Sequence, residues 1–519
     1  MLFSSSIFIF LFLPASLIGY QLLSPFGRPA MLAWLTFASL FFYGYWNPVY
    51  LALLLSSMLI NFFFASRIGR EGRSEASAGR WLTVAVVVNL LVLGYYKYLF
   101  PVLNFFNEHG LIRHNFAGVV LPLGISFFTF TQIAYLSDLR QGAAKRQGLL
   151  PYSVFVTFFP HLIAGPVIHP REVMPQLEQG RIHGLRLDDL SLGLTWFVMG
   201  LAKKVLIADR VAPLADVLYA YPHSAGFATS WLGALTYAMQ LYFDFSGYSD
   251  MALGLARLFS ITFPFNFNSP LKAEGVIEFW QRWHMTVSRY LNEYLYTPIL
   301  RWVNRRRIEA GKKVSNKAAS TPEGFLSMVA FPLMTTMFIG GIWHGAGLQF
   351  LVWGLLQGFF LTVNRAWRVF TPNGHPLHKK LPAPLMVFVN LLCYVVSEVF
   401  FRAASVRDAA YVLGTMAGLH GKIAFSAFPY LNEIPPTSKF MMHLSSAIVA
   451  LGACLFIVWA MPNTQEILGQ LPEGERRKPS LLPRLSWSPS VSWSLGLTAL
   501  FLVSILLLDA SKRFLYFQF

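Results

Sequence analysis

The sequence has 519 residues, of which 55% are hydrophobic and only 13% are charged. Ordinary soluble proteins carry about 25% charged residues, so this composition excludes a soluble multidomain enzyme. Because about 20 apolar residues span a bilayer, the chain is predicted to be a polytopic membrane protein. The net charge of +17 comes mostly from basic residues in short gaps between apolar runs, where they mark the cytoplasmic side and do not indicate nucleic-acid binding. The two cysteines, Cys393 and Cys454, encode no disulfide framework or cysteine metal cluster.

The apolar runs predict an all-α fold with about 11 to 13 membrane helices. Several runs contain charges, glycines or prolines, so we expect some of them to be re-entrant or interfacial. The first run lacks a basic segment before it and is expected to be a retained span, not a cleaved signal. The runs lie at 2–23, 29–46, 48–65, 81–106, 118–136, 150–168, 189–219, 229–258, 324–340, 348–368, 382–402, 443–461 and 490–509.

Basic gaps give the expected orientation. The gaps 66–80, 140–146 and 301–317 are rich in arginine and lysine, which predicts three cytoplasmic loops and an N-terminus outside. Three apolar runs separate the last two gaps, an odd number, so we expect the proline- and glycine-broken run 150–168 not to cross. The Pro- and Ser-rich segment 462–489 is predicted to be a flexible connector before the last span.

Polar residues that break the apolar pattern are concentrated between about 160 and 350. In the first such stretch, Pro160 and Gly165 flank His161 and predict an irregular turn buried in protein. His161 is a candidate for lining a substrate route; the alternative is a histidine that caps freed carbonyls.

The second stretch runs from Gln240 to Asp250. Gln240, Asp244 and Tyr248 recur every four residues and therefore share one helix face. Either a functional site or hydrogen bonding between membrane helices accounts for such a stripe. Asp250 lies elsewhere on the helix, so the two carboxylates are not an acid–base pair on one face.

The third stretch, 278–292, is predicted to form one amphipathic helix. Its four-residue repeat comprises Trp280, His284, Ser288 and Asn292. Such a helix would present His284 to a cavity, while Arg282 and Arg289 would face lipid phosphates or an anionic cofactor. The alternative is an interfacial helix with aromatic and basic anchors.

The fourth stretch, 340–347, has four glycines in eight residues around His344. Glycine lets backbone and ligand approach closely, and a neutral buried imidazole can take a proton from a hydroxyl that attacks a carbonyl. His284 and His344 each follow a tryptophan, Trp283 and Trp343. No serine-hydrolase elbow, Walker loop or zincin motif is present, and the spacing of the histidines does not indicate a metal.

At these motifs the chain resembles the membrane-bound O-acyltransferase family, in particular its bacterial branch of polysaccharide O-acetylation proteins, such as alginate O-acetyltransferase membrane subunits. The similarity covers nearly the whole chain. It is carried by LFSS at 2–5, LPLGISF at 121–127, FPHLIAGP at 159–166, the lysines at 203–204, the stretch 240–250, FWQRWH at 279–284, WHG at 343–345 and FLYFQF at 514–519.

The resemblance implies a single membrane domain over 1–519, with N-terminal helices at 1–136, a catalytic core at 150–370 and C-terminal helices at 382–519. These helices would surround a central tunnel, with His344 as the catalytic histidine and His284 as the second characteristic polar residue of the active site. We expect the other polar or aromatic residues of the four stretches to line the tunnel: Asp244, Gln240, Tyr248, Trp283, Trp343, Ser288, Asn292 and His161. Arg282 is the candidate for binding cofactor phosphates.

The resemblance further implies an enzyme of the bacterial inner membrane with no permanently bound cofactor. Acetyl-CoA would be the donor, approaching from the cytoplasmic side near 301–317, and His344 would act as general base. Periplasmic acetyltransferase partners of a polysaccharide secretion complex would place the acetyl group on the exported polymer.

The sequence departs from the alginate-type pattern at two places. Gln281 replaces a second arginine, which weakens the assignment of Arg282, and the stretch 300–317 is unusually long and basic. Alginate, cellulose and another exopolysaccharide therefore remain open as the polymer. Two other functional classes also remain: a transporter or channel for an acyl donor or polymer, and a scaffold that recruits periplasmic acetyltransferases.

Overall fold

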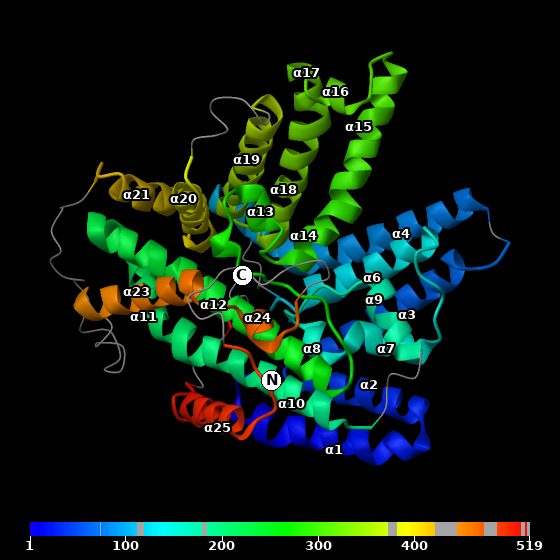
Figure 1. The fold of residues 1–519 in the computed structure, drawn as a ribbon. Coiled ribbons are helices and arrows are strands. Elements are labelled where there is room, and N and C mark those ends of the chain that lie inside the picture. The colour runs from blue at the N-terminus through cyan, green and yellow to red at the C-terminus, as the bar shows by residue number, and fades with distance from the viewer. Residues whose placement is uncertain are drawn as a thin grey trace. The chain divides into compact units, whose positions relative to one another are not determined.

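The computed structural model describes residues 1–72, 74–111, 119–178, 184–371, 381–420, 444–471, 485–509 and 514–515. Within these ranges every regular element is a helix and no strand occurs, which confirms the all-α class (Figure 1). The chain divides into two compact units. Unit 1 comprises Met1–Lys203, Phe245–Phe265 and Ser488–Gln518; unit 2 comprises Lys204–Asp244, Asn266–Trp487 and Phe519. The expected single membrane domain stays a prediction.

Unit 1 is built from the N-terminal helices and the last one. Prolines in the first turns of several of these helices favour helix starts, because a proline there sacrifices no intrahelical hydrogen bond. The elements are η1 (Phe8–Phe12), α1 (Leu13–Leu23), η2 (Ser24–Phe26), α2 (Arg28–Gly44), α3 (Pro48–Ile68), α4 (Glu75–Gly94), η3 (Tyr95–Leu99), α5 (Phe100–Glu108), α6 (Ile125–Arg140), α7 (Leu149–Thr157), α8 (Phe159–Leu162), α9 (Pro170–Glu178), α10 (Leu187–Ala202) and α25 (Val491–Leu506).

Unit 2 holds the remaining elements except the longest helix, which the two units share. They are η4 (Lys203–Ala208), α11 (Asp209–Ala220), η5 (Pro222–Ser224), η6 (Pro270–Lys272), α13 (Val276–Trp280), α14 (Met285–Leu291), η7 (Asn292–Tyr296), α15 (Thr297–Glu309), α16 (Asn316–Ala319), α17 (Pro322–Phe325), η8 (Leu326–Ala330), α18 (Phe331–His344), α19 (Leu348–Phe370), α20 (Ala383–Arg402), α21 (Val406–Met416), α23 (Leu444–Ala460) and α24 (Thr464–Leu468). All of η4 except its first residue, Lys203, lies in unit 2.

The shared helix is α12 (Phe227–Leu258). It contains the whole stretch 240–250, so the prediction of a helix there is confirmed. Its part up to Asp244 belongs to unit 2 and its part from Phe245 onward to unit 1.

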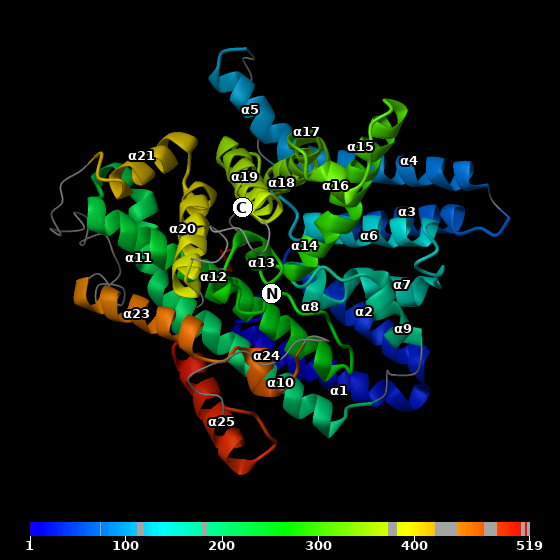
Figure 2. The ribbon, with the colours of Figure 1, turned by 45° about the horizontal axis from the view of Figure 1, so that its top comes forward.

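Glycines allow the close packing of α18 and α19 in unit 2. A Cβ atom on Gly341 would meet the carbonyl oxygen of Phe350, and one on Gly354 would meet that of Met337. The two backbones therefore approach more closely than larger residues allow, as in small-residue contacts between membrane helices. In Figure 1 these helices run side by side. Figure 2 shows α13 beside them, against both α19 and α20.

Six helical stretches are long and apolar enough to cross a membrane, among the residues that the structure describes. They are Phe8–Phe26, Pro48–Ile68, Glu75–Asn107, Leu187–Ala220, Pro322–His344 and Ala383–Arg402. The shorter apolar helices Ser446–Ala460 and Val491–Leu506 add to them. The chain is therefore a multi-pass membrane protein. In the run 150–168 the helices α7 and α8 have nine and four residues and are too short to cross a membrane. This agrees with the prediction that the run does not cross.

Two expected loops are partly helical. The prediction of a loop over 301–317 is wrong at both ends, because α15 continues to Glu309 and α16 begins at Asn316. The predicted connector 462–489 begins with the buried helix α24, whose Asn463 cap donates to Asn268 Oδ1 at 2.9 Å. Residues 472–484 of that connector lie outside the described residues, as do 516–519 of the C-terminal motif.

Candidate active site

His284 lies at a break between two short helices. The prediction of one continuous helix over 278–292 is wrong, because α13 ends at Trp280 and α14 begins at Met285. His284 itself has φ 42° and ψ 51° in the left-handed region. A non-glycine residue adopts this conformation at a cost of about 1–3 kcal/mol and keeps it only where its surroundings hold it. The turn therefore sets the direction of the imidazole, and the four-residue spacing does not.

The residue that holds this turn is Asn266. Asn266 is fully buried, and its Oδ1 lies 2.8 Å from His284 Nδ1 and accepts from Thr286 Oγ1 at 2.9 Å. The backbone N–H of Thr286 also points at Oδ1, at 3.4 Å. In addition, the Asn266 carbonyl accepts from the N–H of Met285 at 2.9 Å. One asparagine thus ties both sides of the histidine.

These contacts assign the tautomer of His284. A backbone N–H can only donate, so the Asn266 atom that faces Thr286 is the oxygen, and an amide oxygen can only accept. His284 Nδ1 therefore carries the hydrogen, and Nε2 carries the lone pair. Burial lowers the pKa of His284 to about 3, which keeps the imidazole neutral. The ring can accept a hydrogen bond or a proton at Nε2.

His344, the last residue of α18, lies among aromatic side chains of unit 2. Its half-buried ring lies 4.7 Å from that of Trp343, 4.8 Å from that of Trp353 and 4.9 Å from that of Phe401, measured between ring centroids. Trp353 in turn donates from Nε1 to Glu398 Oε1 at 3.2 Å. Glu398 is only 3% exposed, and this hydrogen bond positions Trp353, one aromatic wall of the histidine.

Ring contacts connect the two histidines within unit 2. The successive contacts join His284 to Phe267, Phe267 to Trp283, Trp283 to Phe279, Phe279 to Trp280, Trp280 to Trp353, and Trp353 to His344. Trp280 is anchored by its Nε1, which donates to Gln357 Oε1 at 3.1 Å. The structure thus places both predicted histidines, with Trp283 and Trp343, in one aromatic core.

Asp244 belongs to a buried ion pair. Its Oδ1 lies 2.6 Å from Lys204 Nζ, and the same lysine lies 2.7 Å from Asp209 Oδ1. Asp250 pairs instead with Lys203, at 2.6 Å, within unit 1. The two carboxylates therefore serve two different lysines, as expected from their different helix faces. The structural interpretation of Asp244 has a direct contact in its favour; Gln240 is buried nearby on the same helix.

Tyr248 and His161 belong to unit 1. The Tyr248 ring stacks on Phe3 at 4.7 Å and on Phe514 at 4.5 Å. The predicted irregular turn is wrong at His161, which lies in the four-residue helix α8; the turn begins only at Ile163. His161 is buried, with its ring edge-on to Phe263 at 5.7 Å. In both cases the contacts are those of core packing, and the tunnel-lining role of these residues stays a prediction.

The remaining candidates lie near the turn of His284. Ser288 Oγ donates to the carbonyl of Trp283 at 3.3 Å, whereas Asn292 is exposed. Arg282 forms an ion pair with Glu278 at 2.6 Å, so a cofactor phosphate would have to compete with this carboxylate. Among the described residues, no three His, Cys, Asp or Glu side chains lie together in a way that would hold a metal ion.

Sequence reasoning missed Asn266 and Glu398. Glu398 is the only carboxylate in the apolar run 382–402, so the rule that polar residues in spans are functional would have found it. Asn266 gave no such signal, because it lies in an ordinary loop sequence and its importance depends on a contact with a residue 18 positions later.

The sequence of this chain is similar to those of known membrane acyltransferases. A sequence model of the membrane-bound O-acyltransferase family matches residues 120–310, a range that includes Asn266 and His284. A peptidoglycan O-acetyltransferase of Helicobacter pylori is 37% identical over 85% of this chain and 85% of its own length. A probable alginate O-acetylase AlgI of Azotobacter vinelandii is 34% identical over the full length of both chains.

The chain belongs to the membrane-bound O-acyltransferase family. It is therefore an O-acyltransferase embedded in a membrane. A more distant relative, a teichoic acid D-alanyltransferase of Bacillus subtilis, is 28% identical over 56% of this chain and 69% of its own length. Relatives in the membrane-bound O-acyltransferase family thus bear the names of transferases for two different acyl groups.

Proposed function

We propose that this protein passes acetyl groups from acetyl-CoA, on the cytoplasmic side of the bacterial inner membrane, to an exported polysaccharide. The names of the relatives from Helicobacter pylori and Azotobacter vinelandii, which both specify O-acetylation of a cell-envelope or exported polymer, support the acetyl group and the class of acceptor. The observation that carries the proposal is the pair of imidazoles, His284 and His344, joined by one aromatic core.

In the proposed reaction His344 acts as general base. It takes the proton of an acceptor hydroxyl while the hydroxyl oxygen attacks the thioester carbonyl, a role that suits a neutral imidazole in an aromatic site. The new C–O bond forms, the C–S bond breaks, and the proton passes from His344 to the leaving thiolate of coenzyme A. Atoms and charge balance without a metal.

His284 has a different part in this proposal. Because its Nδ1–H is committed to Asn266, its Nε2 can accept a hydrogen bond but cannot donate one to a thioester carbonyl. The side chain therefore orients a donor, such as a substrate hydroxyl or the amide N–H of the pantetheine arm. This is the orienting role; a polarising role would need the opposite tautomer.

The immediate acceptor is proposed to be a periplasmic acetyltransferase partner, which then acetylates the polymer. Alginate, cellulose, another exopolysaccharide and, from the name of the Helicobacter pylori relative, peptidoglycan are the candidate polymers. Ester-linked acetate measured in each polymer fraction of a deletion strain identifies which of them is modified.

The test restores the deletion strain with the wild-type chain, His344→Ala or His223→Ala. His223 is a matched control, because it is an exposed histidine of unit 2 paired with Asp408 at the surface. We expect wild type and His223→Ala to restore polymer acetylation and His344→Ala, inserted at equal levels, to leave it absent. Full acetylation with His344→Ala would overturn the catalytic assignment.

A further inference from the structure

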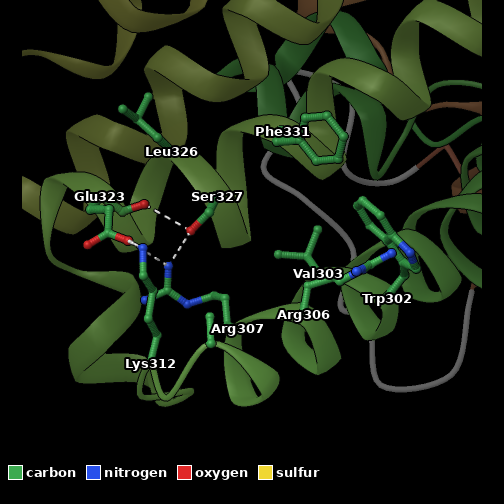
Figure 3. A pocket seen from close by; sticks show the side chains of 10 residues that line it. Trp302, Val303, Arg306, Arg307, Lys312, Glu323, Leu326, Ser327 and Phe331 are labelled. Atoms are coloured by element: carbon green, nitrogen blue, oxygen red, sulfur yellow. Dashed lines mark hydrogen bonds and ion pairs between the residues drawn. The ribbon is translucent and has the colours of Figure 1, made fainter.

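A pocket of about 520 Å³ lies in unit 2 between α15 and the start of the span Pro322–His344. Figure 3 shows it from close by. On one side α15 contributes Trp302, Arg306 and Arg307; on the other, η8 and α18 contribute Leu326 and Phe331. The sequence predicts that acetyl-CoA approaches near 301–317, but the proposed reaction uses none of the residues that line this pocket.

One part of the pocket is apolar and open. Trp302 is 54% exposed, Leu326 is 65% exposed and Phe331 is 47% exposed. Leu326 and Phe331 belong to a candidate membrane span, where exposed apolar side chains face lipid. Trp302, on the neighbouring helix α15, packs against Phe331 with the ring centroids 6.4 Å apart, and tryptophan is typical of the membrane–water interface. This part of the pocket therefore fits an acyl chain.

The other part of the pocket is cationic. Lys312 Nζ lies 2.6 Å from Glu323 Oε1, and Arg307 donates to Ser327 Oγ at 2.7 Å and to the same carboxylate at 3.4 Å. The Arg306 guanidinium lies over the Trp302 ring, 5.7 Å from its centroid. The lining contains these three cations and one carboxylate, which leaves two positive charges in excess for an anion.

We propose that this pocket binds an anionic phospholipid of the cytoplasmic leaflet. Its phosphate lies at Arg306 and Lys312, and its acyl chain lies along Trp302, Leu326 and Phe331. Basic pockets between membrane helices bind anionic headgroups in this way. A free nucleotide phosphate shares the charge of the headgroup, but it would leave the apolar part of the pocket empty.

The pocket is separate from the candidate active site. Phe331 begins α18 and His344 ends it, so 13 residues at 1.5 Å per residue place them about 20 Å apart. A lipid at Phe331 therefore does not occupy the aromatic core around His344, and lipid binding and acyl transfer can be tested independently.

The test measures lipid retention by native mass spectrometry on the full-length protein, extracted from nanodiscs that contain equal amounts of phosphatidylglycerol and phosphatidylcholine. Wild-type protein is expected to retain phosphatidylglycerol in preference. Arg306→Gln is expected to weaken this preference about fivefold, the effect of one basic residue near an anionic surface. The matched control is Arg305→Gln, which removes the same charge from an exposed neighbour that does not line the pocket.

Glu323→Gln gives a change of opposite sign. It removes the carboxylate that occupies Lys312 and Arg307, so the preference for phosphatidylglycerol is expected to rise about fivefold. Equal retention of both lipids, an equal effect of Arg305→Gln and Arg306→Gln, or an unchanged Glu323→Gln would overturn the proposal. Displacement of the lipid by micromolar adenosine 3′,5′-bisphosphate would overturn it in favour of a nucleotide site.

Discussion

Asn266 Oδ1 accepts a hydrogen bond from His284 Nδ1 at 2.8 Å and thereby fixes both the direction and the tautomer of this imidazole. The same oxygen accepts from the side chain and the backbone of Thr286, so the asparagine cannot turn without breaking the start of α14. Asn266 is therefore a positioning residue in the proposed mechanism, and His284 depends on it.

Asn266→Ala is expected to lower kcat about 10²-fold, the typical effect when an orienting group is misplaced by about 1 Å, with little change in KM for acetyl-CoA. The matched control is Asn268→Ala. Asn268 is buried two residues later, but its side-chain oxygen accepts from Asn463. Steady-state transfer by purified protein is the measurement, with thermal unfolding as the check on folding. Equal losses of kcat in both variants would contradict a special role for Asn266.

The pH dependence provides a second prediction. Burial lowers the pKa of His284 to about 3, so kcat/KM should show no step from His284 between about pH 5 and pH 8. Asn266→Asp places a carboxylate against Nδ1, which favours the protonated ring and raises the pKa of His284. Activity of this variant should therefore fall as the pH decreases. A wild-type profile that titrates near 6.5 and shifts with Asn266→Asp would contradict the neutral tautomer.

The lowered pKa of His284 also predicts how the stability of the protein changes with pH. In the unfolded chain the imidazole of His284 takes up a proton near pH 6.5, whereas in the folded chain it does so only near 3. The free energy of unfolding should fall as the pH drops from about 6.5 towards 3 and should gain nothing further above 6.5. His284→Gln should flatten this dependence in a thermal unfolding series; an unchanged slope would show that other groups cause it.

Substitutions of Glu398 test whether its hydrogen bond to Trp353 helps to position the His344 ring. Glu398→Gln keeps an oxygen for the Trp353 indole and should retain most activity. Glu398→Leu leaves the buried indole N–H without its acceptor, at a cost of about 1–3 kcal/mol, and should lower kcat by releasing Trp353 beside His344. Asn390→Leu is the control, since it replaces another buried polar side chain of α20 with leucine, eight residues before Glu398. Equal activity of the Glu398→Gln and Glu398→Leu variants would show that the hydrogen bond to Trp353 does not position His344.

Two glycine-to-alanine substitutions in α18 test whether close packing against α19 stabilises the protein. Gly341→Ala should force α18 and α19 apart and cost about 1–3 kcal/mol, because its Cβ would overlap the carbonyl of Phe350. At Gly340, one residue earlier, a Cβ would lie 3.7 Å from Leu291 Cδ1, an ordinary contact. Gly340→Ala should therefore melt at the wild-type temperature. Similar melting temperatures of both alanine variants would contradict the close packing.

Much of the helical fold could be predicted from the sequence. Each of the six candidate spans lies on a predicted apolar run, whereas other runs, such as 229–258, are not among these spans. The four-residue stripe of Gln240 and Asp244 correctly predicted a helix. The same spacing failed at His284, since a four-residue repeat can continue across a turn that contains neither glycine nor proline. A contact with Asn266 determines that turn, and sequence periodicity contains no information on a contact between residues of different segments.

The most direct test of the central claim, acyl transfer through His344, uses full-length protein in sealed vesicles with acetyl-CoA labelled in the acetyl group. Cell-envelope fractions from a deletion strain supply the acceptors outside. Wild-type protein should release the free thiol of coenzyme A and form labelled acetyl esters outside, and His344→Ala should do neither. Equal ester formation by His344→Ala would contradict the catalytic role of His344, and passage of the label as an intact thioester would identify the protein as a transporter.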